Sequence, residues 1–245
     1  MTSPRRGTPL VLGHRGAAAQ APENTLPALE LALRLGADGV EVDVQRSADG
    51  VLVLVHDTDW LRTAGLGRRV REVPWGEVRR LDAGAWFGSR FRGVAPPRLE
   101  AALESLPDST FVDLEIKSPE DDPGLGAAVL AAALPHAERL RFLLTSFDRD
   151  CLEALLPRAS GIALGLLAKA LPDPGGPLLH QALWAPALLE KPDHVERVHR
   201  AGGQVFAWTV DDPEVAQRLQ DLGVEGIITN EPGKICKSLR RRDAI

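Results

Sequence analysis

The sequence predicts an α/β fold, a (β/α)8 TIM barrel with a small insertion after the second strand. Short runs rich in valine, leucine and isoleucine alternate with longer stretches of alanine and leucine at helical spacing. This alternation is typical of repeated βα units that build a parallel sheet. Eight such strands with helices between them predict closure into a barrel. The 245 residues are a common length for one barrel, so we expect a single domain over 1–245.

The predicted strands share a short apolar run at the end of each repeat. They are Leu10–Gly13, Val40–Val44, Thr110–Ile116, Leu140–Thr145, Ile162–Leu167, Ala182–Ala185, Val205–Thr209 and Gly226–Thr229. The predicted helices lie between them: Glu23–Leu35, Leu99–Leu106, Leu125–His136, Arg149–Leu156, Pro192–Ala201, Pro213–Leu222 and a last helix from Glu231. Gly36 is expected to cap the end of the first helix. Asp212 is expected to cap the start of the helix at Pro213.

The segment between the second and third of these strands breaks the alternation. It begins with an extended run, Val51–Val55, that follows a turn. A loop-rich stretch that holds Trp75, Trp86 and Phe87 comes next. We predict an insertion at about 57–97 that forms a small cap on one end of the barrel.

Composition and charge favour a globular protein that binds small molecules. Hydrophobic residues make up 44% and charged residues 26% of the chain, which is ordinary for a protein with a substantial core. The formal net charge of −5 offers no general attraction to nucleic acid or anionic lipid. We therefore expect no nucleic-acid partner and no stable membrane association. Any positive charge that meets an anionic substrate must be local.

Cysteine usage and the amino-terminal sequence predict a cytoplasmic location. Cys151 and Cys236 fit no metal-ligand spacing, and two free thiols are typical of a reducing compartment. No apolar stretch precedes the first predicted strand, and no apolar run is long enough to span a bilayer. We expect no signal peptide.

Polar residues gather at the carboxyl-terminal ends of the predicted strands, where barrel enzymes place their chemistry. Successive side chains of a strand point to opposite faces. The three valines of the second strand therefore share one face, suited to packing under helices, while Glu41 and Asp43 point toward the barrel axis. The same alternation in the third strand directs Glu115 and Lys117 to the axis.

Several carboxylates in one narrow space repel each other and lose hydration unless a cation compensates. Glu41, Asp43 and Glu115 would supply only oxygen ligands, which select a hard divalent ion such as Mg2+ or Ca2+. An internal salt-bridge network with Arg15 and Lys117 is the alternative. The residues alone leave both interpretations open.

Two histidines flank this predicted carboxylate cluster. His14 follows the first strand, and His56, with Asp57 after it, ends the extended run beyond the second strand. A lone histidine is commonly structural, but a pair suits phosphodiester cleavage. One imidazole would take a proton from the attacking oxygen, and the other would give one to the leaving alcohol.

Motifs in order over nearly the whole chain closely resemble the signature of the bacterial, cytosolic glycerophosphodiester phosphodiesterase family. They are G-H-R-G at 13–16, P-E-N-T-L at 22–26, G-A-D-G-V-E-V-D-V at 36–44, D-G at 49–50, V-H-D at 55–57, L-E-I-K at 114–117, T-S-F at 145–147, W-T-V at 208–210 and G-V-E-G-I-I-T-N-E-P at 223–232. The resemblance implies a (β/α)8 barrel that hydrolyses glycerophosphodiesters to sn-glycerol 3-phosphate and an alcohol. It implies one divalent cation, Mg2+ or Ca2+. Whether the glycerol 2-hydroxyl or water attacks first stays open.

The resemblance also assigns roles by position. It makes His14 and His56 the acid/base pair, Glu41, Asp43 and Glu115 the metal ligands, and Arg15 and Lys117 the phosphate contacts. Trp208 would form an apolar wall for the glycerol carbons, with ordinary barrel packing as the alternative. Glu23 and Asn24 lie in the loop beside His14, where Glu23 would orient His14 or approach the metal.

The chain departs from the family pattern at three places. Thr229-Asn230 stands where the family often has T-D, Ala28 where it often has Phe, and Trp184-Ala185-Pro186 where His-Pro is common. We expect none of these departures to touch the metal or histidine positions. The alternatives in function are a phospholipase-type lipid phosphodiesterase and a non-catalytic barrel that binds a phosphorylated ligand. The acidic charge balance disfavours the first, and retention of every histidine and carboxylate disfavours the second.

Overall fold

The computed structural model of the protein describes residues 7–117 and 121–240. Within these ranges, eight parallel strands form a closed ring. They are β1 (Leu10–His14), β2 (Gly39–Arg46), β6 (Phe111–Ile116), β7 (Arg141–Ser146), β8 (Ala163–Ala168), β9 (His180–Trp184), β10 (Val205–Trp208) and β11 (Gly226–Thr229). The ring closes because β1 pairs with both β11 and β2. The predicted (β/α)8 barrel is confirmed.

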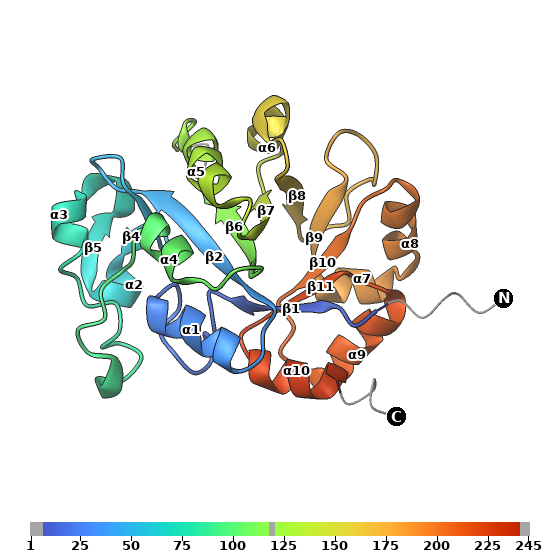
Figure 1. The fold of residues 1–245 in the computed structure, drawn as a ribbon, viewed down its shortest axis with the longest axis horizontal. Coiled ribbons are helices and arrows are strands. Elements are labelled where there is room, and N and C mark those ends of the chain that lie inside the picture. Colours follow the sequence, from blue (N-terminus) through green and yellow to red (C-terminus); the bar gives the residue numbers. More distant parts are fainter. Residues whose placement is uncertain (1–6, 118–120, 241–245) are drawn as a thin grey trace.

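Helices follow the strands around the outside of the ring (Figure 1). They are α1 (Leu26–Arg34), α4 (Leu99–Ser105), α5 (Leu125–Ala133), α6 (Arg149–Leu155), α7 (Ala185–Glu190), α8 (Asp193–Arg200), α9 (Pro213–Leu222) and α10 (Pro232–Arg240), with short 3-10 turns after α5 and α6 at Leu134–His136 and Leu156–Arg158. The Asp212 side chain caps α9 by accepting from the Glu214 amide, as predicted. The cap of α1 is Leu35, and Gly36 follows it with a φ of 94°. None of the described helices has the length and apolar character needed to cross a membrane.

Two predicted elements were misplaced at their ends. The sixth strand runs over His180–Trp184, and α7 already begins at Ala185, which the prediction gave to the strand. The proline in the first turn of α7 suits a helix start. The first helix begins at Leu26 and not at Glu23, because Asn24 has a left-handed φ of 55° that a helix excludes.

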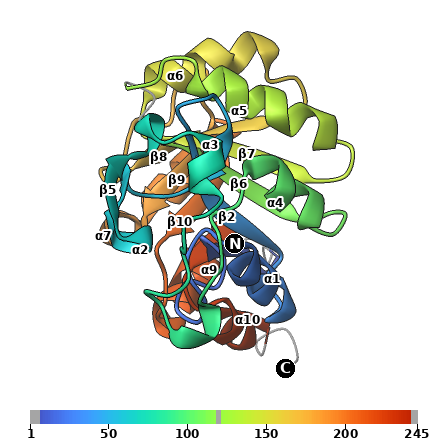
Figure 2. The same ribbon diagram turned by 90° about the vertical axis from the view of Figure 1, so that its left-hand side faces the viewer.

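The insertion predicted after the second strand is present and has a small core of its own. It starts with β3 (Leu52–Leu54), which pairs antiparallel with the end of β2. The rest comprises β4 (Asp59–Trp60), α2 (Leu61–Ala64), β5 (Leu66–Arg69), the 3-10 turns Val70–Glu72 and Ser89–Phe91, and α3 (Trp75–Val78). Its core residues are Val53, Val55, Trp60, Val70, Val73 and Val78. Figure 2 views the molecule from the side on which these elements lie.

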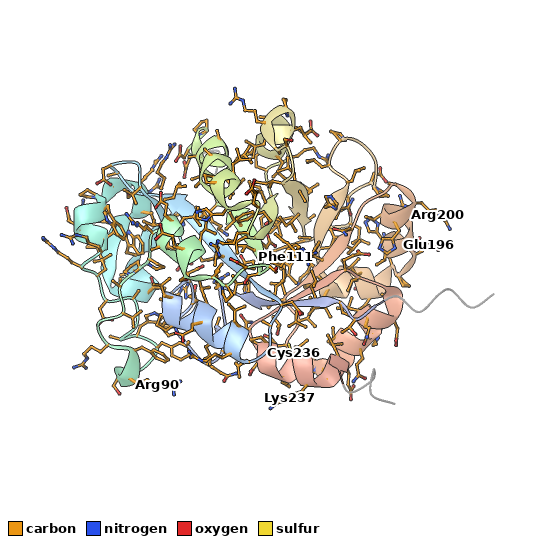
Figure 3. All side chains as sticks on the ribbon, in the orientation of Figure 1. Arg90, Phe111, Glu196, Arg200, Cys236 and Lys237 are labelled. Atoms are coloured by element: carbon orange, nitrogen blue, oxygen red, sulfur yellow. The ribbon has the colours of Figure 1, made fainter. Side chains whose placement is uncertain are left out.

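The outward faces of the strands pack under the helices, as the alternation predicts. The valines of β2 belong to an apolar cluster that includes Leu29 of α1 and Val129 of α5. Inward side chains of the strands form a separate apolar cluster, which comprises Leu12, Phe111, Leu143, Leu167, Ala182, Phe206 and Ile228. Phe111 lies near the middle of the molecule, whereas Arg90 of the insertion lies at its edge (Figure 3).

Two glycines allow close packing around Phe111 and Phe206 of this inner apolar cluster. Phe111 and Phe206 have ring centroids 5.5 Å apart. A Cβ at Gly226 would lie 2.2 Å from the Phe206 ring, and one at Gly39 would lie 2.0 Å from the Phe111 carbonyl oxygen. These two positions therefore admit only glycine without a shift of the neighbouring strands. The inner apolar cluster supports the polar residues farther along the same strands.

Candidate active site

A cavity of about 250 Å³ lies at the carboxyl-terminal ends of the barrel strands. Most residues singled out in the sequence line it, namely His14, Arg15, Glu41, His56, Glu115, Lys117 and Trp208. Strand register brings them together: His14 lies opposite Glu41 across β1 and β2, and Asp43 lies opposite Glu115 across β2 and β6. Residues from both halves of the sequence therefore share one pocket.

Three carboxylates converge beside this cavity. Ligand atoms of Glu41, Asp43 and Glu115 all lie within 4.8 Å of one another. Glu41 and Asp43 are buried, and Glu115 is half-buried. The loop before α1 holds Asp43 in place, because the Asn24 side chain donates to its Oδ2 at 2.7 Å and accepts from its backbone amide at 3.2 Å. The predicted supporting residue Asn24 is thus a direct partner of a candidate metal ligand.

Two cations contact the carboxylate cluster without neutralising it. Arg15 Nε lies 3.1 Å from Asp43 Oδ2, and Lys117 Nζ lies 2.7 Å from Glu115 Oε1. Glu41 Oε2 accepts from the Arg15 amide at 2.9 Å, while Glu41 Oε1 is buried without a hydrogen-bond partner. The alternative salt-bridge network is therefore present together with the cluster. Three carboxylates against two cations, with a buried oxygen left over, fit a hard divalent cation bound by oxygen ligands.

The pKa values of the cluster show how strongly its charges interact. Burial, together with the neighbouring Asp43 and Glu115, raises the pKa of Glu41 well above its usual range. Burial also raises the pKa of Glu115 to about 7. Burial acts in the same direction on Asp43, but Arg15 and Lys117 outweigh it and lower the pKa of Asp43. A bound cation would relieve this repulsion and favour the ionised carboxylates.

Each of the two histidines has its Nδ1 bound to a partner behind it. His14 Nδ1 lies 2.8 Å from Asn230 Oδ1, and His56 Nδ1 lies 2.8 Å from Asp57 Oδ1. His14 Nε2 lies 3.9 Å from Glu41 Oε2, on the side of the carboxylate cluster. Burial, followed by the charge of Arg15, lowers the pKa of His14. Both rings line the cavity, and in each the contact at Nδ1 leaves Nε2 as the second ring nitrogen.

The expectation that no departure from the family pattern touches a histidine was wrong. Asn230, which stands where the family often has Asp, contacts the imidazole of His14 directly. The two residues are 216 positions apart, and closure of the barrel between β1 and β11 brings them together. The spacing of the strands along the sequence could not show that Asn230, just after β11, meets His14, at the end of β1.

Glu23 has ion-pair partners that the sequence reasoning missed. Its carboxylate contacts Arg15 Nη1 at 2.9 Å and Arg62 Nη1 at 2.7 Å, and Arg15 in turn contacts the carboxylate cluster. Arg62 Nε also donates to Asp57 Oδ2 at 2.6 Å. Hydrogen bonds from Arg62 lower the pKa of Asp57 to about 2. Arg62 lies in α2 of the insertion, where no periodic pattern marked it.

Aromatic and cationic side chains form the outer part of the cavity. Trp208 lines it, donates from its indole nitrogen to the Ala182 carbonyl at 2.9 Å and packs edge-on against Phe147 with centroids 5.7 Å apart. Phe147 is 50% exposed. Lys169, which follows β8, also lines the cavity and was not predicted. Its position just after a barrel strand is the signal that could have identified it.

The chain is similar over nearly its whole length to proteins of one family. The model of the glycerophosphoryl diester phosphodiesterase family matches residues 14–234. A glycerophosphodiester phosphodiesterase of Caldanaerobacter subterraneus subsp. tengcongensis is 35% identical over 242 residues, which cover 95% of this chain and 98% of that protein. A probable glycerophosphodiester phosphodiesterase 1 of Mycobacterium tuberculosis is 34% identical over 254 residues, with coverage of 93% and 91%.

A solved structure agrees with these sequence matches. It is that of a phosphodiesterase from Oleispira antarctica in complex with the product sn-glycerol-3-phosphate. Its TM-score to this chain is 0.85 at 28% identity, and the match covers 95% of this chain and 97% of that one.

Proposed function

This chain belongs to the glycerophosphoryl diester phosphodiesterase family, and we propose that it releases sn-glycerol 3-phosphate from glycerophosphodiesters with a divalent cation bound by Glu41, Asp43 and Glu115. The observation that carries the proposal is the convergence of these three carboxylates beside a cavity that both His14 and His56 line. The Oleispira antarctica structure holds sn-glycerol-3-phosphate as product, which supports this choice of released fragment.

The cavity has separate groups for binding and for proton transfer. Arg15 and Lys117 contribute the positive charge that a phosphodiester requires, and both line the cavity beside the carboxylates. Trp208 supplies an apolar surface for the glycerol carbons. A bound Mg2+ or Ca2+ would stabilise negative charge on the phosphoryl oxygens. The Nε2 atoms of the two histidines are the proton acceptors and donors within reach.

The two imidazoles divide the proton transfers between them. One accepts the proton of the attacking hydroxyl while its oxygen forms a bond to phosphorus. The other donates a proton to the departing alcohol oxygen as the bond from that oxygen to phosphorus breaks. Hydrogen bonds to Nδ1 of both rings leave Nε2 as the atom that exchanges the proton. If the attacking hydroxyl is that of water, this step releases sn-glycerol 3-phosphate directly. If it is the glycerol 2-hydroxyl, the step gives a cyclic phosphate, which water then opens with the two proton transfers in the opposite direction.

We further propose that the substrate is a water-soluble small molecule handled in the cytoplasm by one barrel domain, without nucleic acid or a stable membrane contact. The net charge of −5 supports this preference over an anionic surface. Comparing glycerophosphocholine in solution with lysophosphatidylcholine in micelles tests it. Faster turnover of the micellar lipid would favour the phospholipase-type alternative.

Metal removal is the direct test of the main proposal. Release of sn-glycerol 3-phosphate is followed with a coupled dehydrogenase for several headgroups, with and without a chelator. We expect chelation to abolish turnover and added Mg2+ or Ca2+ to restore it. Glu115→Gln should weaken metal binding, whereas Glu104→Gln on the exposed face of α4 should not. Full activity of the metal-free protein would refute the ligand assignment.

A further inference from the structure

A chain of hydrogen bonds lies behind His14, on the side away from the carboxylate cluster. It starts at Asp211, in the loop between β10 and α9, and passes through Asn230, which directly follows β11. Asn230 Nδ2 donates to Asp211 Oδ2 at 2.7 Å, and Asn230 Oδ1 lies 2.8 Å from His14 Nδ1. The Asn230 amide therefore joins a carboxylate to the imidazole.

The position of Asp211 is fixed independently of the histidine. Its Oδ1 accepts from the Asn230 backbone amide at 2.8 Å and from Thr229 Oγ1 at 2.9 Å. Its backbone carbonyl accepts from Lys234 Nζ at 3.0 Å. Asp211 is thus anchored by the end of β11 and by α10, and its Oδ2 has a defined direction.

The chemistry of these groups determines which nitrogen of His14 carries the proton. An ionised carboxylate only accepts hydrogen bonds, so the group of Asn230 that faces Asp211 must be the NH2. The carbonyl oxygen of Asn230 must then face His14, and it accepts only from a protonated nitrogen. His14 Nδ1 therefore carries a hydrogen, and in the neutral ring Nε2 presents its lone pair.

We propose that Asp211 and Asn230 are positioning residues that hold His14 in the Nδ1–H tautomer, with the Nε2 lone pair toward the cavity. Neither residue lines the cavity itself, and both act through the His14 imidazole. His56 reaches the same tautomer in a different way, because its Nδ1 meets the carboxylate of Asp57 directly. At His14 a neutral amide separates the imidazole from the carboxylate charge.

The pairing explains why this chain has Asn at 230 beside Asp211. An aspartate at 230 would set two carboxylates at the 2.7 Å separation that an N–H···O bond now spans. The same hydrogen-bond pattern returns if both residues are exchanged. An amide at 211 would accept from the 230 backbone and Thr229 through its oxygen and donate to a carboxylate at 230, which would accept from His14.

Asp211→Asn alone should invert the tautomer. The new amide must keep its oxygen toward the 230 backbone amide and Thr229, so its NH2 faces Asn230. Asn230 would then turn its oxygen toward residue 211 and its NH2 toward His14, which accepts only through an unprotonated Nδ1. The hydrogen of the neutral ring would move to Nε2, where it blocks proton acceptance from the substrate.

The test combines the single variant Asp211→Asn, the double variant Asp211→Asn with Asn230→Asp, and Asp212→Asn as a matched control with the same charge change. Asp212 caps α9 and faces solvent. Long-range 1H–15N correlation spectra, recorded with Mg2+ at a pH where imidazoles are neutral, report the tautomer. A His14→Gln variant identifies the His14 signals. Coupled assays give kcat and KM.

We expect Nδ1–H in the wild type, the double variant and the control, and Nε2–H in Asp211→Asn. The kcat of Asp211→Asn should fall at least tenfold with KM within about twofold, and the double variant should recover most of the loss. The proposal is overturned if His14 of the wild type carries its hydrogen on Nε2. It is also overturned if Asp211→Asn changes neither the tautomer nor kcat. If the single variant does not fold, Nε2–H in the double variant overturns it equally.

The kinetic part rests on the proposed function, whereas the tautomer part does not. Tautomers that follow the expected pattern in a protein without phosphodiesterase turnover would refute the proposed function and leave the positioning of His14 intact. Phosphodiesterase turnover with the same His14 tautomer in every variant would refute the positioning of His14 and leave the proposed function intact.

Discussion

The same strands carry apolar side chains at one end of the barrel interior and polar side chains at the other. Toward the amino-terminal end, inward side chains such as Leu12 and Phe111 form an apolar cluster. Two or four residues farther along the same strands, His14 and Glu115 line the polar cavity. Strand alternation decides that a side chain faces inward, but its distance along the strand decides its surroundings. The apolar end provides rigidity, and the polar end can then hold carboxylates that repel each other.

Asp113 marks the boundary between these two ends. It lies on β6 between Phe111 and Glu115, is fully buried and accepts from Thr145 Oγ1 at 2.7 Å. Its Oδ2 has no hydrogen-bond partner, and burial raises its pKa to about 8. A buried carboxyl with a raised pKa therefore lies between the apolar cluster and the charged one.

The largest expected effect on stability comes from the apolar end. Phe206→Ala removes a fully buried ring beside Gly226 and should cost about 3–5 kcal/mol of unfolding free energy. Because Phe206 does not line the cavity, kcat per folded molecule should stay near the wild-type value. Denaturant unfolding and active-site-normalised assays measure the two quantities. A large loss of kcat at unchanged stability would show that the two ends are not separable.

The largest expected effect on activity comes from the histidines at the polar end. His14→Ala and His56→Ala should each lower kcat on the order of 100-fold, since each removes a proton-transfer group. His136→Ala, in the 3-10 turn before β7, is the matched control and should retain normal turnover. Steady-state assays compare the three variants. A histidine whose removal leaves kcat at the wild-type level has no part in proton transfer.

Loss of a phosphate-facing charge should have a smaller effect. Lys117→Met should raise KM and lower kcat by roughly tenfold each, because a charged hydrogen bond contributes about 1.5–3 kcal/mol. Lys169→Met removes the same charge from the exposed outer part of the cavity and should change both constants less. Equal effects of the two variants would mean that Lys117 acts only through the general field of the pocket.

The last expected effect concerns the pH dependence of stability at the boundary residue Asp113. Because the folded-state pKa of Asp113 is raised, its stabilising contribution is complete below the usual value of 3.8 and is lost as pH rises through about 8. Asp113→Asn should therefore flatten the fall in unfolding free energy of the chelated protein between pH 5 and 8. A difference of one bound proton changes the unfolding free energy by about 1.4 kcal/mol per pH unit. Asp108→Asn, an exposed control, should keep the wild-type slope.

The sequence predicted the barrel well because its strands carry a simple periodic signal. Seven of the eight predicted strands begin within a residue of the observed ones. The sixth was predicted to begin at Ala182, and the observed strand begins two residues earlier, at His180. The stretch before it, 172–177, is rich in proline and glycine and has no periodicity to set a boundary. The short helix α7 was missed because its six residues hold too few turns to show a pattern.

The candidate site was predictable only where it depends on alternation along one strand. The inward directions of Glu41, Asp43 and Glu115 follow from period two, and the structure brings their oxygens together. The contacts of Arg62 and Asn230 depend on how distant loops meet, which spacing along the chain does not encode. Their roles, like those of the other site residues, stay predictions for the experiments above.

The salt bridge of Arg62 to Glu23 fastens the insertion to the barrel, and its salt bridge to Asp57 lies within the insertion. Glu23 lies in the loop after β1, and Asp57 orients His56. The insertion is therefore not an interchangeable module for protein engineering. A chimera that replaced residues 57–97 with a short turn would have to supply a carboxylate for His56 and a guanidinium for Glu23. Without them, the His56 imidazole and the Glu23–Arg15 pair would both lose a partner.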